Sequence, residues 1–417
     1  MVAYIVGPFM LVFFKLSYWK KQIIKKYYPE HLIFIDSTRA LKQLVLRTPL
    51  QQLTVAVWAS TPNILNFTQD EFFKTHPVKI LRIEDGFIRS NGLGSKYFYP
   101  YSLVFDDLGI YYNCQTPSRL EVLLNTFNTR TDQEELKAQS RKLISKIIEL
   151  NITKYAQGPQ KTPIVLPPQL SSYGLKKQLS TIKLHGTTDQ GANSSFEIPK
   201  QNTSPLDHLS KRKEVPNLAN TKPKVILIPG QVETDASVIT SGCGYDSFKL
   251  LQEVRRKNPL SFIIFKIHPD VLFSSRQGIA NRKELLKFAN YVCSDNTPIT
   301  TLIELADEVH TISSLSGFDA LIRGKKIFTY GMPFYAGWGL TTDQAVCPRR
   351  TAKLTLEALV ACALILYPKY YNWHLDQPTD ALTVCSTLAK IASSEQNRIM
   401  LLGDLFLRIW RKLGLHR

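Results

Sequence analysis

The sequence predicts an α/β protein with two Rossmann-like domains that face each other across a cleft. Two observations lead to this prediction. Strand and helix patterns alternate along the second half of the chain, as they do in a doubly wound parallel sheet. A stretch rich in Pro, Ser, Thr, Asn and Gln, over 157–222, divides the 417 residues into two halves that are each long enough to bury a core. We expect this stretch to be a disordered linker or insertion of low sequence complexity.

Residues 1–156 are predicted to form the N-terminal domain. The apolar start of the chain and the basic stretch behind it predict a first strand and a first helix, with attachment to a membrane surface as the alternative. Short apolar runs predict further strands at 31–36, 54–60, 78–84, 102–107 and 109–113. Amphipathic patterns predict helices at 116–127 and 131–150.

Residues 223–350 are predicted to form the C-terminal domain, and residues 351–417 are expected to add C-terminal helices. Strands of the second domain are expected at 224–229, 261–267, 291–294, 308–313 and 326–330. Helices are expected at 246–257, 281–289, 300–306 and 317–324. Ligands of such sheets bind beyond the carboxyl ends of the strands, so polar residues that directly follow a strand are candidates for a site.

The composition points to an anionic partner. Lys and Arg number 52 against 34 Asp and Glu, which gives a formal charge of +18. The basic residues are spread along the chain and form no nucleic-acid-binding motif, which argues against a nucleic acid as that partner. The six cysteines form no CxxC or Cys/His cluster. Neither a zinc site nor a disulfide framework is therefore expected, and the cysteine usage fits a reducing cytoplasm.

No stretch of the sequence reaches the ~20 apolar residues that a membrane-spanning helix needs. In the tail, over 403–417, apolar residues recur at helical spacing beside basic ones. A basic amphipathic helix of this kind docks either on an anionic membrane surface or on the protein itself, and both alternatives stay open.

A serine-rich turn follows the strand predicted at 308–313. Ser313, Ser314 and Ser316 lie just before the helix expected from Gly317. Backbone N–H groups and the helix dipole at such a turn bind anions, and the hydroxyl groups add donors. An ordinary serine N-cap is the alternative. No Walker lysine or GxGxxG pattern is present, which argues against triphosphate and dinucleotide ligands.

Two other predicted strands of the second half end in polar residues. The run FKIHPD places Lys266 and His268 at one strand end, where the imidazole either pairs with a phosphate oxygen or has a structural role. The run PGQVETDAS places Gln231 and Asp235 beyond another strand. Because glycosyl chemistry needs carboxylates on either side of the reacting carbon, Glu233 and Asp235 are together candidates for nucleophile and acid/base partner, with a polar loop as the alternative.

In the first half, Glu84, Asp85 and Arg89 crowd a glycine turn at a strand end. The guanidinium fork of Arg89 suits a carboxylate. A loop rich in aromatic residues and glycine contains Tyr335 and Trp338, which pack either against a sugar, base or acceptor or within the loop itself. The paired aspartates of FDDLG are typical of a hairpin turn, so no metal site is expected there.

Together these segments resemble the β-Kdo transferases of the bacterial capsule polysaccharide biosynthesis/export family, where Kdo is 3-deoxy-manno-octulosonic acid. The segments occur in the family's order and cover roughly residues 80–366 outside the insertion. They read RIEDGFIRSNGLGS, YSLVFDDLGIYYN, TKY, LIPGQVETDAS, KIHPDV, DEVHTISSLSGFDALIRGK, TYGMPFYAGWGLT and LEALVACALILYP. The capsule enzymes that the chain resembles carry two such modules, and this sequence carries one.

The resemblance implies a GT-B-like enzyme that moves Kdo from CMP-Kdo to a saccharide or glycolipid acceptor, with retention of configuration through a carboxylate adduct. It implies that Asp235 is the nucleophile and that Glu84 or Asp85 is the acid/base partner. Lys266 and Arg89 would offset the charge of the sugar acid. The N-terminal domain would form the acceptor and catalytic side, and the C-terminal domain would bind the nucleotide. The implied donor-binding residues are Gln231, Lys266, His268, Ser313, Ser314, Ser316, Gly317 and Arg89.

The expected partners are CMP-Kdo, an anionic saccharide or lipid-linked acceptor, and the capsule synthesis and export machinery. The expected location is the cytoplasm, with peripheral attachment to the inner face of the bacterial inner membrane. No metal or other cofactor is expected, because cations and helix N-termini suffice for one phosphate and one carboxylate. Two alternatives stay open: a transferase for another CMP-activated sugar acid, such as a sialic acid, and a non-catalytic partner in capsule export.

Overall fold

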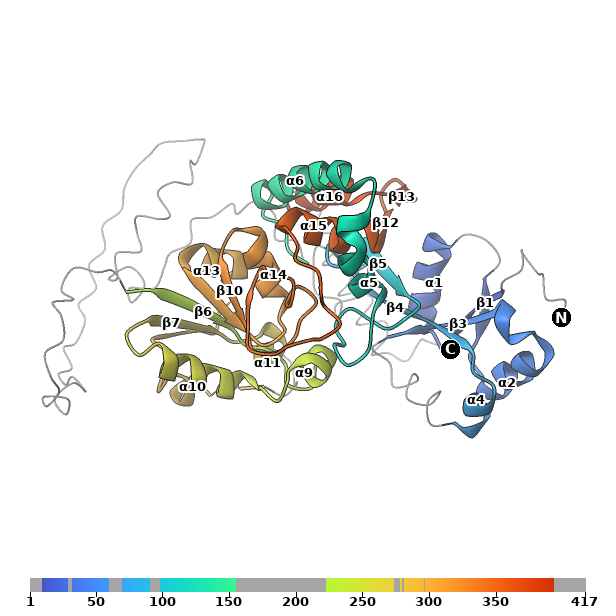
Figure 1. The fold of residues 1–417 in the computed structure, drawn as a ribbon, viewed down its shortest axis with the longest axis horizontal. Coiled ribbons are helices and arrows are strands. Elements are labelled where there is room, and N and C mark those ends of the chain that lie inside the picture. The colour runs from blue at the N-terminus through green and yellow to red at the C-terminus, as the bar shows by residue number, and fades with distance from the viewer. Residues whose placement is uncertain are drawn as a thin grey trace, which may run out of the picture.

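The computed structural model contains two sheets that lie next to each other along the long axis of the molecule (Figure 1). It describes residues 10–28, 32–59, 70–90, 98–154, 223–273, 278–279, 281–295 and 297–393. The predicted insertion and the basic tail lie outside the described residues.

The N-terminal sheet has seven strands in the order β13-β12-β5-β4-β3-β1-β2. The strands are β1 (Met10–Phe14), β2 (Ile33–Ile35), β3 (Leu53–Trp58), β4 (Lys79–Asp85), β5 (Ser102–Asp106), β12 (Pro368–Asn372) and β13 (Gln377–Thr379). Strands β4, β3, β1 and β2 are parallel, and β5, β12 and β13 add antiparallel pairings. The chain runs from β1 to β2 on one side and then to β3 on the other. The strand order therefore reverses between β1 and β3, and this reversal is a topological switch point.

Helices cover both faces of the parallel part of this sheet. Val12 and Val55 pack with residues of α2 on one face, and Phe13 and Ala56 pack with residues of α1 on the other. Because successive strand residues point to opposite faces, a continuous apolar run such as β1 fits a sheet that is buried on both sides. The helices of this half are α1 (Tyr18–Tyr27), α2 (Thr38–Arg47), α4 (Glu71–Thr75), α5 (Arg119–Thr126) and α6 (Gln133–Glu149).

The C-terminal sheet has six parallel strands in the order β11-β10-β9-β6-β7-β8, which is the strand order of a Rossmann fold. Its switch point lies between β6 and β9. The strands are β6 (Val225–Pro229), β7 (Phe262–Lys266), β8 (Tyr291–Cys293), β9 (Glu308–Thr311), β10 (Lys326–Thr329) and β11 (Thr342–Asp343). The helices are α9 (Ala236–Ser241), α10 (Ser247–Lys257), α11 (Pro269–Phe273), α12 (Arg282–Leu285), α13 (Ile299–Leu305) and α14 (Leu315–Ile322).

The strand predicted at 109–113 is wrong, because the chain turns there. The carboxylate of Asp106 accepts the backbone N–H groups of Leu108 at 2.9 Å and Gly109 at 2.8 Å, which bends the chain away from β5. The hydroxyl of Tyr367 donates to the same carboxylate at 2.7 Å. A buried carboxylate with this many donors forms a turn rather than a second strand.

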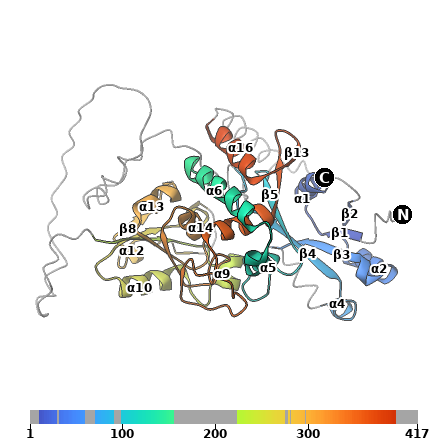
Figure 2. The same ribbon diagram turned by 45° about the horizontal axis from the view of Figure 1, so that its top comes forward.

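The C-terminal segment rejoins the N-terminal sheet, so the expectation of helices alone over 351–417 is wrong. Strand β12 pairs antiparallel with β5, and Tyr370 lies opposite Ser102. Figure 1 shows α15 and α16 beside α6, next to the β5 side of this sheet, and Figure 2 shows α16 beside α6 from another direction. The N-terminal domain is therefore built from two separate parts of the chain. The elements of the segment are α15 (Leu356–Val360), the π-helix η4 (Ala361–Leu366), β12, β13 and α16 (Ala381–Ser393).

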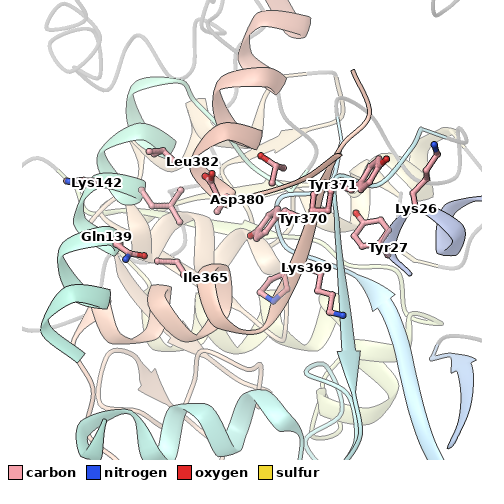
Figure 3. Close-up of a pocket in the computed structure, with 15 residues that line it drawn as sticks. Lys26, Tyr27, Gln139, Lys142, Ile365, Lys369, Tyr370, Tyr371, Asp380 and Leu382 are labelled. Atoms are coloured by element: carbon pink, nitrogen blue, oxygen red, sulfur yellow. The ribbon is translucent and has the colours of Figure 1, made fainter. Parts of the chain in front are cut away.

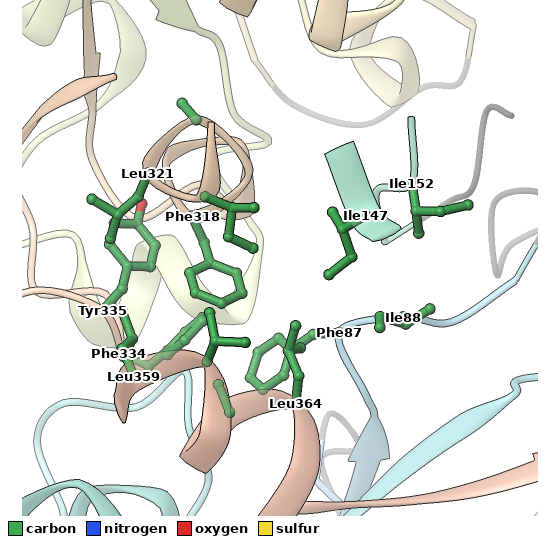
Figure 4. Close-up of a cluster of buried hydrophobic side chains, with 14 of the residues drawn as sticks. Phe87, Ile88, Ile147, Ile152, Phe318, Leu321, Phe334, Tyr335, Leu359 and Leu364 are labelled. Atoms are coloured by element: carbon green, nitrogen blue, oxygen red, sulfur yellow. The ribbon is translucent and has the colours of Figure 1, made fainter. Parts of the chain in front are cut away.

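One hydrophobic core joins the two halves (Figure 4). The ring of Phe87, just beyond β4, has its centroid 4.5 Å from that of Phe334 and 6.2 Å from that of Phe318. The guanidinium of Arg323 donates to the carbonyl of Ile152 at 3.1 Å. These contacts hold the carboxyl end of β4 against the C-terminal half.

Candidate active site

Gln231 joins the ends of β6 and β9 at the switch point of the C-terminal sheet. Its side-chain oxygen accepts the backbone N–H of Ser313 at 3.0 Å, and its amide nitrogen donates to the Ser313 hydroxyl at 3.1 Å. The side chain is buried, with 7% of its surface exposed. Gln231 therefore positions the serine turn, and the structure brings these two predicted donor residues together.

Asp235 is the N-cap of α9, where it joins the same polar chain. Its Oδ1 accepts the backbone N–H of Ser237 at 2.9 Å and the Ser237 hydroxyl at 2.8 Å. The Ser237 hydroxyl in turn lies 3.5 Å from the Ser313 hydroxyl. Both bonds to Asp235 use one oxygen, so they hold the half-buried carboxylate in one orientation beside the serine turn.

Ser314 is the N-cap of α14, as the alternative of an ordinary serine cap expects. Its hydroxyl accepts the backbone N–H of Ser316 at 3.2 Å, and its own N–H donates to the Thr311 hydroxyl at 3.1 Å. Gly317 allows the close approach of Tyr335, because a Cβ at this position would lie 2.2 Å from the tyrosine hydroxyl oxygen. The helix thus begins at Leu315, two residues before the predicted start.

The expectation that Tyr335 and Trp338 contact a sugar or acceptor is wrong in this structure. Both side chains are fully buried. The Tyr335 hydroxyl donates to the carbonyl of Ser314 at 2.5 Å, and the Trp338 indole N–H donates to the carbonyl of Phe334 at 2.8 Å. Their polar atoms are satisfied inside the core, which is the loop-packing alternative.

His268 and Lys266 are both at the end of β7, but their contacts differ. The backbone N–H of Asp270 donates to His268 Nδ1 at 3.1 Å, so a neutral ring carries its proton on Nε2. The Lys266 ammonium is buried and donates to the carbonyl of Thr297 at 2.7 Å. No hydrogen bond or ion pair in the described part of the chain joins Lys266 to Asp235. Lys266 holds the loop between β8 and α13, and the expectation that it offsets a substrate charge is not met.

Glu84 and Asp85 are successive residues of β4, and their carboxylates differ in their partners. Arg89 is buried and pairs through Nε with Asp85 Oδ2. Its Nη1 donates to the Ser90 hydroxyl at 2.7 Å. Glu84 Oε1 accepts the backbone N–H of Asp85 at 3.1 Å. Glu84 Oε2 is buried and has no hydrogen-bond partner in the described structure. Asp85 Oδ1 is likewise buried without a hydrogen-bond partner in the described residues. The two carboxylates therefore differ in that Arg89 offsets the charge of Asp85 and not that of Glu84.

The surroundings of Glu84 favour its protonated form. Burial raises the pKa of Glu84, and the charge of Asp85 adds to the rise, while the cations Lys154 and Lys20 oppose it. Burial also raises the pKa of Tyr112. The negative charge of Glu84 and, more weakly, that of Asp235 raise it further. A carboxyl group with a raised pKa suits general acid/base catalysis near neutral pH. Tyr112 lies within the electrostatic range of the candidate carboxylates of both halves.

A pocket of about 570 Å³ lies elsewhere, between α1, α6, α16 and β12 (Figure 3). The charged residues that line it are Lys26, Lys142, Lys369 and Asp380. None of the predicted site residues lines it. The candidate site is instead the polar edge where the strands of both sheets end.

Two absences concern only the described residues. No group of three or more His, Cys, Asp or Glu side chains there is arranged to hold a metal ion. No helix in the same part of the chain has the length and apolarity to cross a membrane.

The family of the chain follows from its match to a family model described as capsule polysaccharide biosynthesis protein, over residues 53–370. The chain belongs to this family. The family assignment confirms the resemblance of the eight sequence segments. The matched residues include β4, β6, β7 and β9.

Among curated members of the family, the chain is 34% identical to the capsule polysaccharide modification protein LipA of Neisseria meningitidis serogroup A. The alignment covers 386 residues, 92% of this chain and 46% of LipA, so the chain spans about half the length of this relative. It is 29% identical to the lipopolysaccharide-processing protein LpsZ of Rhizobium meliloti over 370 residues, 87% of this chain and 70% of LpsZ.

Two solved structures of KpsC from Thermosulfurimonas dismutans are similar to the chain. The β-Kdo 2,7 transferase is 31% identical with a TM-score of 0.64, and the match covers 91% of this chain and 99% of that chain. The β-Kdo 2,4 transferase is 24% identical with a TM-score of 0.64, covering 90% and 97%. The second likeness concerns the fold alone, and together they confirm the predicted GT-B-like variant with two Rossmann-like domains.

Sequence reasoning missed three residues near the site. Lys154 belongs to the TKY segment, but the sequence alone predicts no role for it. Its charge lowers the pKa values of Glu84 and Asp319, against the effect of burial. Tyr112 lies in the stretch that was expected to be a strand. Lys20 is one of four lysines in α1, and nothing in the pattern distinguishes it from the other three.

Proposed function

We propose that the chain is a glycosyltransferase that moves Kdo from CMP-Kdo to a saccharide or glycolipid acceptor in capsule or cell-surface polysaccharide synthesis. The observation that carries the proposal is the likeness to the KpsC β-Kdo 2,7 transferase, of which the chain covers 99% at 31% identity. The arrangement of polar groups at the strand ends is consistent with it. The donors at the ends of β7 and α14 suit a phosphate, and carboxylates at the strand ends suit glycosyl transfer.

In the first proposed step, the carboxylate of Asp235 attacks the anomeric carbon of Kdo. The bond between this carbon and the phosphate oxygen of CMP breaks, and its electron pair leaves with CMP. The product is an ester of Asp235 with inverted configuration at the sugar. The helix-capping bonds to Ser237 hold the carboxylate in place for this attack.

In the second proposed step, an acceptor hydroxyl gives its proton to the ionised form of Glu84, which later releases it to solvent, and the hydroxyl oxygen attacks the same carbon. The ester bond breaks, the carboxylate of Asp235 is restored, and two inversions amount to retention. Glu84 suits this role because its pKa is raised and because Arg89 pairs with Asp85 instead of Glu84. Asp85, paired with Arg89, supports the strand end instead.

The CMP phosphate is assigned to donors of the C-terminal half. His268 contributes its imidazole, whose Nδ1 accepts the backbone N–H of Asp270. The hydroxyls of Ser313 and Ser316 and the N-terminal dipole of α14 add further attraction for an anion. The proposed steps use no metal, because backbone and side-chain donors at a helix N-terminus suffice for one phosphate.

Incubation of the purified chain with CMP-Kdo and a Kdo-ended glycolipid or saccharide tests the proposal. We expect release of CMP that depends on the acceptor, and an acceptor product heavier by one Kdo. Faster turnover of CMP-sialic acid than of CMP-Kdo would favour the alternative sugar acid. CMP release from neither donor with any of these acceptors would favour a non-catalytic export partner.

A further inference from the structure

Lys20 is a half-buried cation in the first turn of α1. Its ammonium lies 4.1 Å from the centroid of the Trp58 ring, which is itself buried. Within the described part of the chain, Lys20 donates no hydrogen bond and forms no ion pair. The next residue, Lys21, instead pairs with Asp36 at 2.5 Å. Lys20 therefore has three N–H donors and a charge that the described residues leave without a contacting acceptor.

Lys20 lies at the switch point of the N-terminal sheet. Helix α1 follows β1, and Trp58 is the last residue of β3, so the ammonium stands at the carboxyl ends of the two strands between which the order reverses. Doubly wound sheets bind their ligands at such a point. Strand β4 adjoins β3, with Ile83 opposite Trp58, and Glu84 follows directly.

The charges near Lys20 favour one more anion. Burial lowers the pKa of Lys20, and the charges of Glu84 and Asp85 act against this lowering. Asp85 is already paired with Arg89, so its charge is locally offset. A carboxylate ligand beside Glu84 needs a cation, and a half-buried ammonium without a contacting anion gains most from one.

We infer that Lys20 binds the carboxylate on the anomeric carbon of the sugar acid and so positions this carbon between Glu84 and Asp235. The inference rests on the proposed function and adds a specificity-determining residue to it. Lys20 takes the role that was expected of Lys266. It precedes residues 53–370, over which the chain matches the family model.

Three variants test this role. Lys20→Met keeps the apolar stem over Trp58 and removes the charge, Lys20→Arg keeps a charge, and Lys21→Met removes a neighbouring charge as a matched control. For Lys20→Met we expect kcat/KM for CMP-Kdo to fall about 10- to 100-fold, in the range of one lost charge-assisted bond. The affinity for CMP, which lacks the sugar carboxylate, should stay the same. Lys21→Met should behave as the wild type.

The pH dependence separates a binding role from a structural one. If the ammonium must be protonated, kcat/KM of the wild type falls as the pH rises through the lowered pKa of Lys20. Lys20→Arg should recover part of the activity and shift this fall to higher pH, because a guanidinium stays protonated. An unchanged kcat/KM in Lys20→Met, an equal loss of CMP affinity, or an unmoved alkaline fall in Lys20→Arg would overturn the inference. Absence of CMP-Kdo turnover in the wild type and in Lys21→Met would instead refute the proposed function, and with it the ligand assigned to Lys20.

Discussion

Replacing Asp235 by Asn separates the structural and the chemical roles of this side chain. As the N-cap of α9, it accepts two hydrogen bonds from Ser237 through Oδ1, and an amide oxygen accepts both equally well. Asn and Asp cap helices about equally, so the free energy of unfolding should change by less than about 0.5 kcal/mol. A neutral amide cannot replace the nucleophile, so turnover should fall on the order of 10⁴-fold or more, equivalent to about 5.5 kcal/mol in the barrier.

Asp246→Asn is the matched control. Asp246 is the N-cap of α10, and its carboxylate accepts the backbone N–H of Lys249 at 2.7 Å on the exposed surface. The same chemical change is therefore made at another cap of the same domain, where no substrate is placed. We expect wild-type turnover from Asp246→Asn. Asp235→Ala should also lose the cap and about 1 kcal/mol of stability.

Intact-mass spectrometry with CMP-Kdo and no acceptor measures the adduct directly. The wild type and Asp246→Asn should each gain the mass of one Kdo, and peptide mapping should place it on Asp235. Asp235→Asn should gain none while binding CMP as tightly as the wild type. Activity in Asp235→Asn, or an adduct on Glu84 or Glu233, would show that the nucleophile is a different carboxylate.

Three further predictions concern the proposed general base Glu84, the phosphate contact of His268 and the basic surface of the protein. Glu84→Gln should lower kcat about 10²- to 10⁴-fold. The raised pKa of Glu84 makes the wild-type rate fall, as the pH decreases, at a higher pH than an ordinary glutamate would, and persistence of this acid limb in Glu84→Gln would contradict the assignment. His268→Ala should lower kcat/KM for CMP-Kdo about 10- to 1,000-fold, or ~1.5–4 kcal/mol, and unchanged kinetics would leave His268 with a structural role. The full chain should sediment with anionic vesicles at low salt and be released at high salt, whereas salt-independent pelleting would argue against an electrostatic surface contact.

The strand ends could be located from the sequence because parallel strands all present their carboxyl ends at one edge. Gln231, Asp235 and Ser313 follow from that rule, and the structure joins them through short polar contacts. The direction of a terminal side chain does not follow from it. Lys266 is the last residue of a buried strand, and the carbonyl of Thr297, on a loop of unrelated pattern, decides where its ammonium lies.

Contacts between residues far apart in the chain could not be predicted from the sequence either. Composition cannot distinguish an aromatic residue that binds a sugar from one that fills a core. Tyr335 is buried because Gly317 has no side chain and leaves room for the tyrosine hydroxyl. Strand β12 is short and begins with proline, and its partner β5 lies far back in the sequence. Lys20 is equivalent to its neighbours in local pattern, and only the position of Trp58 in the folded sheet distinguishes it.

The pairing of β12 with β5 affects how the protein is synthesised. Strand β5 leaves the ribosome well before β12, because the whole C-terminal sheet lies between them in the chain. Until β12 arrives, β5 is an edge strand with unpaired N–H and C=O groups, and such edges promote aggregation of nascent chains. The early domain therefore completes its sheet only after the late domain has been made. A nonsense mutation shortly before Pro368 would spare the six-stranded sheet and damage the domain that was translated first.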